Sequence, residues 1–207
     1  MKKTQRKQFI SYFRKRLESL DYCNATFENA LEDEKQDMVD SVNRGNISKD
    51  DPELLEAFSK IDYLILPTFR NCMIVAVCTF LEETLRRVGI LSFTDFDSEV
   101  NKLSNMSKIR KYLEVYQSKM AVDLHPIKDY VCRIDDIILL RNAIVHPWGK
   151  IDNCTNPEKL REVIARREWV LETGDGYIHL TDQAYAEVFE PVLEIVEYLV
   201  DKIPVTD

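Results

Sequence analysis

Glycine and proline are scarce in this 207-residue sequence, which contains 5 of the first and 7 of the second. Because turns between short strands draw heavily on these residues, their scarcity argues against a many-stranded sandwich or barrel. Hydrophobic residues are plentiful at 45%, beside 31% charged residues, which excludes wholesale disorder. We therefore expect one all-α domain over residues 1–207, a helical bundle with a small β-hairpin before the C-terminal helix.

The sequence also lacks an excess of basic residues, with 28 Lys and Arg against 36 Asp and Glu. Proteins that bind nucleic acid through bulk electrostatics usually contain a clearly basic domain, so the composition disfavours that class but still allows a local basic cleft. The N-terminus is an exception, because residues 1–16 contain no acid. This run is either a solvated helix face or a contact for an RNA backbone. Its cations are Lys2, Lys3, Arg6, Lys7, Arg14, Lys15 and Arg16.

Long apolar runs and paired cysteines are missing as well. The longest apolar run, Cys72 to Leu81, is ten residues if Thr79 is included, whereas a membrane-spanning helix needs about 20. The basic N-terminus lacks the apolar centre of a signal peptide. The five cysteines are odd in number and form no CxxC pair, which argues against a disulfide scaffold or a zinc site. We expect a reducing, cytoplasmic protein without a membrane partner.

The spacing of apolar residues predicts the helices. Residues 9–42 repeat at a helical period, which predicts one long helix, or two collinear ones, ending near Gly45. The apolar stretch around residues 72–81 predicts a buried central helix that begins near Pro67 and stops at Gly89. Further helices are predicted over residues 53–63, 108–120, 126–145, 157–167 and 182–202, and a hairpin over residues 168–180.

One segment combines charged and polar groups in a way that suggests chemistry: Arg141-Asn142-Ala143-Ile144-Val145-His146-Pro147-Trp148-Gly149. Arg141 lies in phase with the apolar Ile138 and Val145 and has no carboxylate three or four residues away. An unpaired buried charge is costly, so this arginine must be paired across the fold or line a cleft. Asn142 and His146 are four apart and share a helix face, so the amide can hydrogen-bond and orient the imidazole.

An arginine and a histidine suit the cleavage of a phosphodiester without a metal. The guanidinium binds anionic charge and the imidazole, at a helix C-terminus that favours its protonated form, transfers protons. The alternative is structural, with Arg141 paired to a distant acid and His146 capping a helix. The residues by themselves leave both interpretations open.

The segment resembles the signature of the HEPN superfamily, R-x4–6-H, in the form R-N-A-I-V-H at the end of a long helix. The resemblance implies a helical bundle that forms a homodimer, with the arginine and histidine of both protomers meeting in a cleft at the interface. It implies a metal-independent and cofactor-free endoribonuclease of a toxin or an antiviral defence system. Arg141 would contact the phosphate, His146 would be the general acid–base, and Asn142 would orient it.

The same resemblance implies how RNA would be cleaved. The substrate's own 2′-hydroxyl would attack the adjacent phosphate, leaving a 2′,3′-cyclic phosphate and a 5′-hydroxyl, so DNA would be resistant. Residues 126–149 would be the motif helix, and residues 1–45 and 168–180 would be additions to the family's domain. A cognate antitoxin or regulatory protein is a further implied partner.

The resemblance also has limits and alternatives. Some HEPN toxins continue H-x-Y, with a tyrosine that a partner nucleotidyltransferase modifies, and here Trp148 stands in that place. Some HEPN domains lack nuclease activity, so a second hypothesis is a non-catalytic module that dimerises or binds a nucleotide or a protein. A third hypothesis is a helical antitoxin or adaptor that covers a partner's active site.

Secondary candidates surround the motif. Trp148 either stacks on a base or plugs the core, and Lys150 is a further candidate for substrate contact. Glu82 and Glu83 end the apolar part of the central helix. They are either acidic partners of Arg141 or surface acids paired with a nearby arginine of their own helix.

Two other groups receive no catalytic role. Asp135 and Asp136 are adjacent on the motif helix, so their side chains point about 100° apart, and no third ligand is evident. We therefore expect no metal. His125 precedes a predicted helix and His179 lies in a predicted strand, and we assign neither a function.

Overall fold

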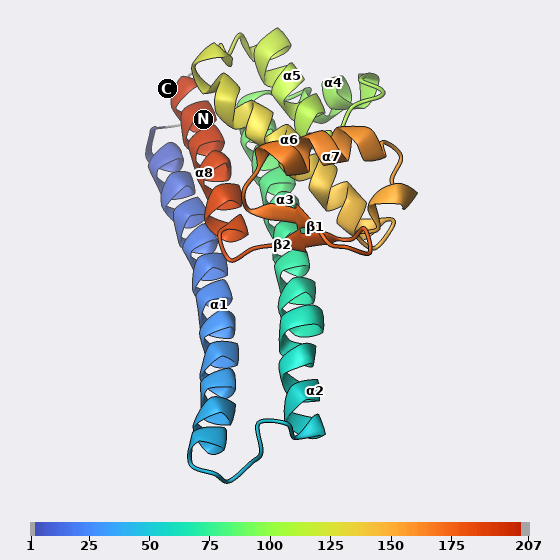
Figure 1. The fold of residues 1–207 in the computed structure, drawn as a ribbon. Coiled ribbons are helices and arrows are strands. Elements are labelled where there is room, and N and C mark those ends of the chain that lie inside the picture. The colour runs from blue at the N-terminus through green and yellow to red at the C-terminus, as the bar shows by residue number, and fades with distance from the viewer. Residues whose placement is uncertain (1–2, 204–207) are drawn as a thin grey trace.

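The computed structural model describes residues 3–203 and confirms an all-α bundle with a small antiparallel hairpin (Figure 1). The elements are α1 (Lys3–Asn43), α2 (Pro52–Lys60), a π-helical turn η1 (Ile61–Ile65), α3 (Leu66–Ser92), α4 (Phe96–Lys102), α5 (Lys108–Met120), a 3-10 turn η2 (His125–Ile127), α6 (Lys128–Val145), a 3-10 turn η3 (Ile151–Asn153), α7 (Pro157–Arg166), β1 (Val170–Glu172), β2 (Ile178–Leu180) and α8 (Ala184–Lys202).

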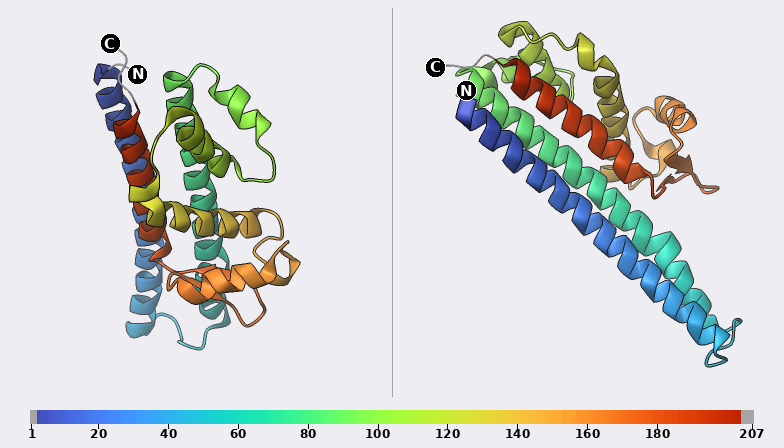
Figure 2. Two further views of the ribbon diagram at one scale, coloured as in Figure 1. Left: turned by 90° about the horizontal axis from the view of Figure 1, so that it is seen from above. Right: turned by 90° about the vertical axis from the view of Figure 1, so that its left-hand side faces the viewer.

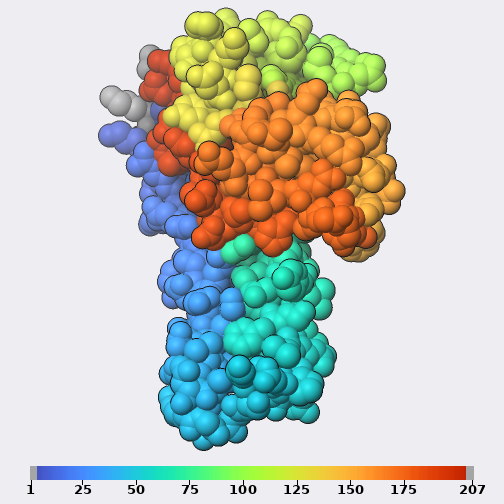
Figure 3. Space-filling view, viewed as in Figure 1, coloured from blue at the N-terminus to red at the C-terminus, as the bar shows by residue number. Residues whose placement is uncertain are grey.

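The molecule consists of a helical body and a projecting stalk, which the three ribbon views show (Figures 1 and 2). The stalk is residues 27–69, where the C-terminal half of α1 runs beside α2 and the start of α3. In the body, α8 packs against α1, α3 and α6. The space-filling view shows the stalk as much narrower than the body (Figure 3).

Helix α3 is the centre of the body, as predicted, and contacts α5, α6 and α8. Its side chains Ile74, Val77 and Leu81 belong to the main hydrophobic core. Gly89 does not stop this helix, which continues to Ser92. The ring of Phe96 lies directly against Gly89, and a Cβ there would overlap it. The glycine is thus required for packing, and the prediction that it ends the helix is wrong.

The predicted break before Pro67 is also wrong, because α2, η1 and α3 form one continuous helix. Proline lacks an N–H, and its ring collides with the carbonyl four residues earlier in a regular α-helix. Here the preceding turn is widened, and the N–H of Leu66 bonds to the carbonyl of Ile61, five residues back. This π-turn lets the helix pass through Pro67 without ending.

By length and composition, the continuous helix Pro52–Ser92 could cross a membrane. It contains an 18-residue window with a mean hydropathy of 1.8, of which 28% is buried. The apolar run from Cys72 to Leu81 is only ten residues long and so did not predict this longer apolar window. Ile74, Val77 and Leu81 of this helix are buried under other helices of the bundle, whereas most of the apolar window is not buried inside the protein.

The N-terminal cations attach α1 to α8. Arg14 donates from Nη2 to Glu197 Oε2 at 2.7 Å, and Arg6 donates from Nη1 to the carbonyl of Asp201 at 3.0 Å. Lys7 and Lys15 are exposed. Lys2 and the side chain of Lys3 lie outside the described residues. Two of the seven cations thus hold helices together rather than forming a solvated face or contacting RNA.

The hairpin closes the body at the base of the stalk. Its strands are antiparallel, with Val170 opposite Leu180 and Glu172 opposite Ile178, and each is shorter than predicted. Arg70 of α3 donates to the carbonyl of Leu180 at 3.0 Å and forms a bidentate ion pair with Glu28 of α1, with Nε–Oε1 at 2.8 Å. This one arginine joins both stalk helices to the hairpin.

Candidate functional site

The C-terminal end of α6 positions the motif. Its inner face, including Ile137, Leu140 and Ile144, is buried. The helix ends at Val145, as predicted from Pro147. The N–H of Gly149 then bonds to the carbonyl of Ala143 at 2.9 Å and closes the helix end. This packing leaves Asn142 and His146 exposed on the outer face.

Arg141 has no acidic partner in the part of the chain that the structure describes. Its Nη1 donates to Asn142 Oδ1 at 3.0 Å, while its Nε is buried without a hydrogen-bond partner. Burial raises the pKa of the Cys78 thiol on α3 to about 12, and the positive charge of Arg141 partly opposes that shift. The guanidinium therefore lies within electrostatic range of α3. Between residues 3 and 203, the structural alternative of an arginine paired with a distant acid is not found.

The predicted hydrogen bond between Asn142 and His146 is not among those formed by the described residues. The amide oxygen accepts from Arg141 instead. A charged guanidinium is a stronger donor than a neutral imidazole, so it takes the shared acceptor. Asn142 therefore orients the arginine, and the histidine ring is left free at the helix end.

The two glutamates of α3 differ from each other. Glu83 Oε1 lies 3.5 Å from Arg87 Nε, four residues on, which is the surface pair considered above. Arg86 pairs with Asp97 at 2.6 Å. Glu82 is half-buried and has no ion pair within residues 3–203. Its charge further raises the pKa of Cys78, against the effect of Arg141, so Glu82 and Arg141 act on the same thiol without touching.

Beside His146 lies a pocket of about 410 Å³ between the end of α6 and the segment from η3 to α7. Sequence reasoning missed this pocket, because its second wall is built by a short polar segment without periodicity. The pocket is lined by Leu139, Asn142, Ala143, His146, Pro147, Asn153, Cys154, Thr155, Asn156 and Leu160.

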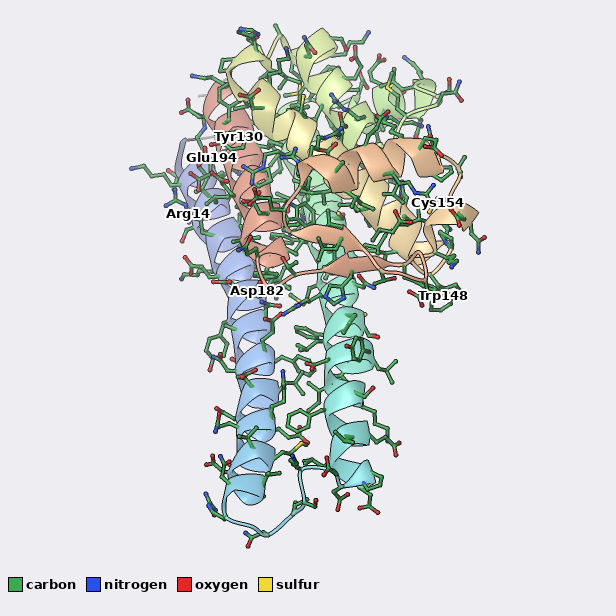
Figure 4. All side chains as sticks on the ribbon, in the orientation of Figure 1. Arg14, Tyr130, Trp148, Cys154, Asp182 and Glu194 are labelled. Atoms are coloured by element: carbon green, nitrogen blue, oxygen red, sulfur yellow. The ribbon has the colours of Figure 1, made fainter. Side chains whose placement is uncertain are left out.

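Trp148 is 85% exposed, so the interpretation as a core plug is wrong. Its backbone is left-handed, with φ of 55°, a conformation that disfavours a side chain with a Cβ. Together with Gly149 (φ 79°), it reverses the chain after α6. Figure 4 shows Trp148 and Cys154 along the same edge of the body.

Lys150 contacts the turn of the hairpin through its ammonium group. Its Nζ donates to the carbonyl of Asp175 and lies 4.8 Å from the centre of the Tyr177 ring. These contacts hold the ammonium on the loop between the strands. Lys150 therefore supports the chain after the motif instead of offering a free cation beside His146.

The adjacent aspartates of α6, Asp135 and Asp136, form ion pairs with arginines. Asp135 pairs with Arg110, and Asp136 is buried and accepts from Arg166 and Arg167, the latter with Nη2–Oδ2 at 2.7 Å. Between residues 3 and 203, no group of three or more His, Cys, Asp or Glu side chains is placed to hold a metal ion. The pair is thus a structural anchor for α5 and α7.

The two remaining histidines lie away from the motif. His125 is exposed at the start of η2. His179 is half-buried in β2, where burial, with a smaller contribution from Arg70, lowers its pKa.

The chain matches no protein-family model, no curated protein and no solved structure.

Proposed function

We propose that this protein is a metal-independent endoribonuclease of the HEPN type, with Arg141 and His146 in its active site. The proposal rests on the burial of Arg141 Nε and on its missing hydrogen-bond partner within residues 3–203. The exposed His146 caps the same helix five residues further on. An incompletely satisfied guanidinium and an exposed imidazole at the same helix end are suited to an anionic ligand that undergoes proton transfer.

The reaction would proceed as a transesterification within RNA. A neutral His146 accepts the proton of the 2′-hydroxyl as that oxygen bonds to phosphorus. A protonated His146 of a second protomer donates to the 5′-oxygen as the phosphorus–oxygen bond to it breaks. Arg141 stabilises the charge that develops on the nonbridging oxygens. The products are a 2′,3′-cyclic phosphate and a 5′-hydroxyl, and the protons balance between the two histidines.

The requirement for a second protomer follows from the number of groups. One copy contributes a single Arg141 and a single His146 to this site. Ile138 and Val145, three and four residues from Arg141, are apolar and partly exposed. A two-fold dimer built on this face would bring both motifs together and cover its apolar side chains.

The test is cleavage of a mixed pool of labelled RNAs in EDTA. Wild type should produce cyclic-phosphate ends. Arg141→Ala and His146→Ala should each lower the rate by about 10²-fold or more while remaining dimeric. Matched controls are Arg16→Ala and His125→Ala, which remove an exposed arginine and an exposed histidine elsewhere. Undiminished cleavage by either motif variant would exclude this active site.

A second candidate function, a non-catalytic binding module, is favoured by a different observation. On the stalk, Tyr63 is 81% exposed and Leu64 is 62% exposed, in a region rich in acids. Exposed apolar side chains of this size are typical of a protein-binding surface. A dimeric wild type that leaves the whole RNA pool intact would favour this candidate.

A further inference from the structure

We propose that the pocket beside His146 binds the base of a ribonucleotide next to the cleaved bond and thereby selects the cleavage site. This inference rests on the proposed function, because it assigns a specificity pocket to the same site. A pocket of about 410 Å³ lies within the range of small-molecule sites and suits one nucleoside.

The chemistry of the lining favours a base over a phosphate. None of the residues that line the pocket is a Lys, Arg, Asp or Glu. Its apolar part comes from Leu139, Ala143 and Leu160, which offer a surface for the flat face of a base. Its polar part comes from neutral amides and a hydroxyl, which supply both donors and acceptors to the edge of a base.

Several of these polar groups are unused by the protein. Within the described chain, the side chains of Asn153 and Thr155 make no hydrogen bond. Asn156 Oδ1 accepts from the N–H of Lys159 at 3.2 Å and caps α7, which leaves its NH₂ group free. Cys154 is already committed, because its Sγ donates to the carbonyl of Lys150. Asn153, Thr155 and the amide nitrogen of Asn156 are therefore the groups available to read a base.

The pocket and the proposed active site share residues. His146 and Asn142 line the pocket, and Asn142 also holds Arg141 through its amide oxygen. Arg141 itself does not line the pocket, so a phosphate held by Arg141 would lie outside it, on the side of Asn142. The base of an adjoining nucleotide can then enter the pocket in an unstacked, single-stranded RNA.

The first experiment measures binding of the four nucleoside 3′-monophosphates by calorimetry, which needs no catalysis. We expect one of them, or one class of base, to bind about fivefold or more tightly than the others. Asn153→Leu and Thr155→Val should each weaken binding of the preferred nucleotide about three- to tenfold, the effect of losing one hydrogen bond. Asn46→Leu and Thr94→Val, exposed residues outside the pocket, are the matched controls and should change nothing.

The second experiment maps cleavage positions on a random RNA pool with the same variants. The base preferred as a monophosphate should be enriched beside the cut, and the enrichment should fall in Asn153→Leu and Thr155→Val. Cleavage with a position profile that these variants leave unchanged would overturn the pocket but not the nuclease. A monophosphate preference without any cleavage of RNA would support a nucleotide pocket and overturn the proposed function. Equal binding of all four monophosphates would overturn the inference.

Discussion

The body and the stalk share α1 and α3 but are held together differently. Residues 27–69 contain 11 Asp and Glu against 4 Lys and Arg, a net charge of −7 out of −8 for the whole chain. The buried apolar residues of the stalk, Leu31, Leu54 and Ile61, are separate from the core of the body. The body is nearly neutral and shares one continuous core. A helical period of apolar residues therefore predicts helices in the body and in the stalk equally well, but it does not predict how much apolar surface each region buries.

What holds the stalk is a short series of contacts between its two helices. The rings of Phe27 and Phe69 stack with centres 3.9 Å apart, and Lys35 Nζ lies 3.0 Å from Asp62 Oδ1. Arg70 and Glu28 close the series where the stalk joins the body. Because few apolar groups are removed from water, we expect the stalk to open locally before the body unfolds.

The largest expected difference concerns thiol reactivity. Burial raises the pKa of Cys78 to about 12, which lowers its thiolate fraction at pH 8 about a thousandfold against an ordinary thiol. Cys78 should resist alkylation in the folded protein, while the exposed Cys72, on the same helix and just beyond the stalk, should react. Mass spectrometry after timed labelling measures both sites. Equal labelling in native buffer would mean that the core around Cys78 opens readily and does not protect the thiol.

A pair of cavity mutations compares the two regions directly. Leu81→Ala, in the body, should lower the free energy of unfolding by about 2–5 kcal/mol. Leu54→Ala, in the stalk, should cost about 1–2 kcal/mol, because solvent can reach the vacated space. Urea unfolding followed by circular dichroism checks both. Similar losses for the two variants would contradict the distinction between body and stalk.

The buried carboxylate of the body comes next. Asp136→Asn leaves two arginines beside a neutral amide, and we expect a loss of about 2 kcal/mol because both remain partly solvated. Asp135→Asn, on the adjacent and more exposed residue, is the control and should cost less. The measurement is the urea midpoint of each variant against wild type. A larger loss for Asp135→Asn would place the anchor on the other carboxylate.

The smallest effect is expected in the stalk. Lys35→Met removes the ion pair with Asp62 and should cost less than about 1 kcal/mol. The hydrogen bond to Asp62 raises the pKa of Lys35, so the pair contributes fully at neutral pH. Its contribution is lost as the pH rises through the folded-state pKa of the lysine. Unfolding of wild type and Lys35→Met at pH 7 and above pH 11 tests this, and a gap that widens with pH would refute it.

Apolar spacing predicted the helices well, where the chain follows a regular period. Both ends of the helix Lys108–Met120 were predicted correctly, and α1 is one of the two forms expected from the apolar spacing of residues 9–42. Errors came where the structure accommodates a residue that usually ends or starts a helix. Gly89 accommodates the ring of Phe96 instead of ending its helix, and Pro67 is absorbed by a wider turn.

The position of the candidate site was predicted, and the roles of its residues stay a prediction. The short motif located Arg141, Asn142 and His146 at one helix end, where the structure places them. It did not reveal that the amide bonds the arginine, since two side chains compete for one oxygen. The pocket wall of residues 153–156 carries no periodic signal. The sequence signal for this wall is the run Asn153-Cys154-Thr155-Asn156 before a proline, which is typical of a polar loop that ends in a helix N-cap.

The π-turn in the stalk also fixes a rotational phase. Each residue of an α-helix turns the following side chains by about 100°, so a widened turn offsets all residues of α2 against those of α3. With that offset, Leu54 and Ile61 are buried in the stalk, and Ile74, Val77 and Leu81 of α3 are buried in the core of the body. Deleting one residue from Ile61–Ile65 would remove the widened turn, bring the ring of Pro67 against the carbonyl four residues earlier and rotate α2 about its axis by about 100°. The rotation of α2 about its axis relative to α3, and so of the stalk relative to the body, is therefore set by one turn of helix.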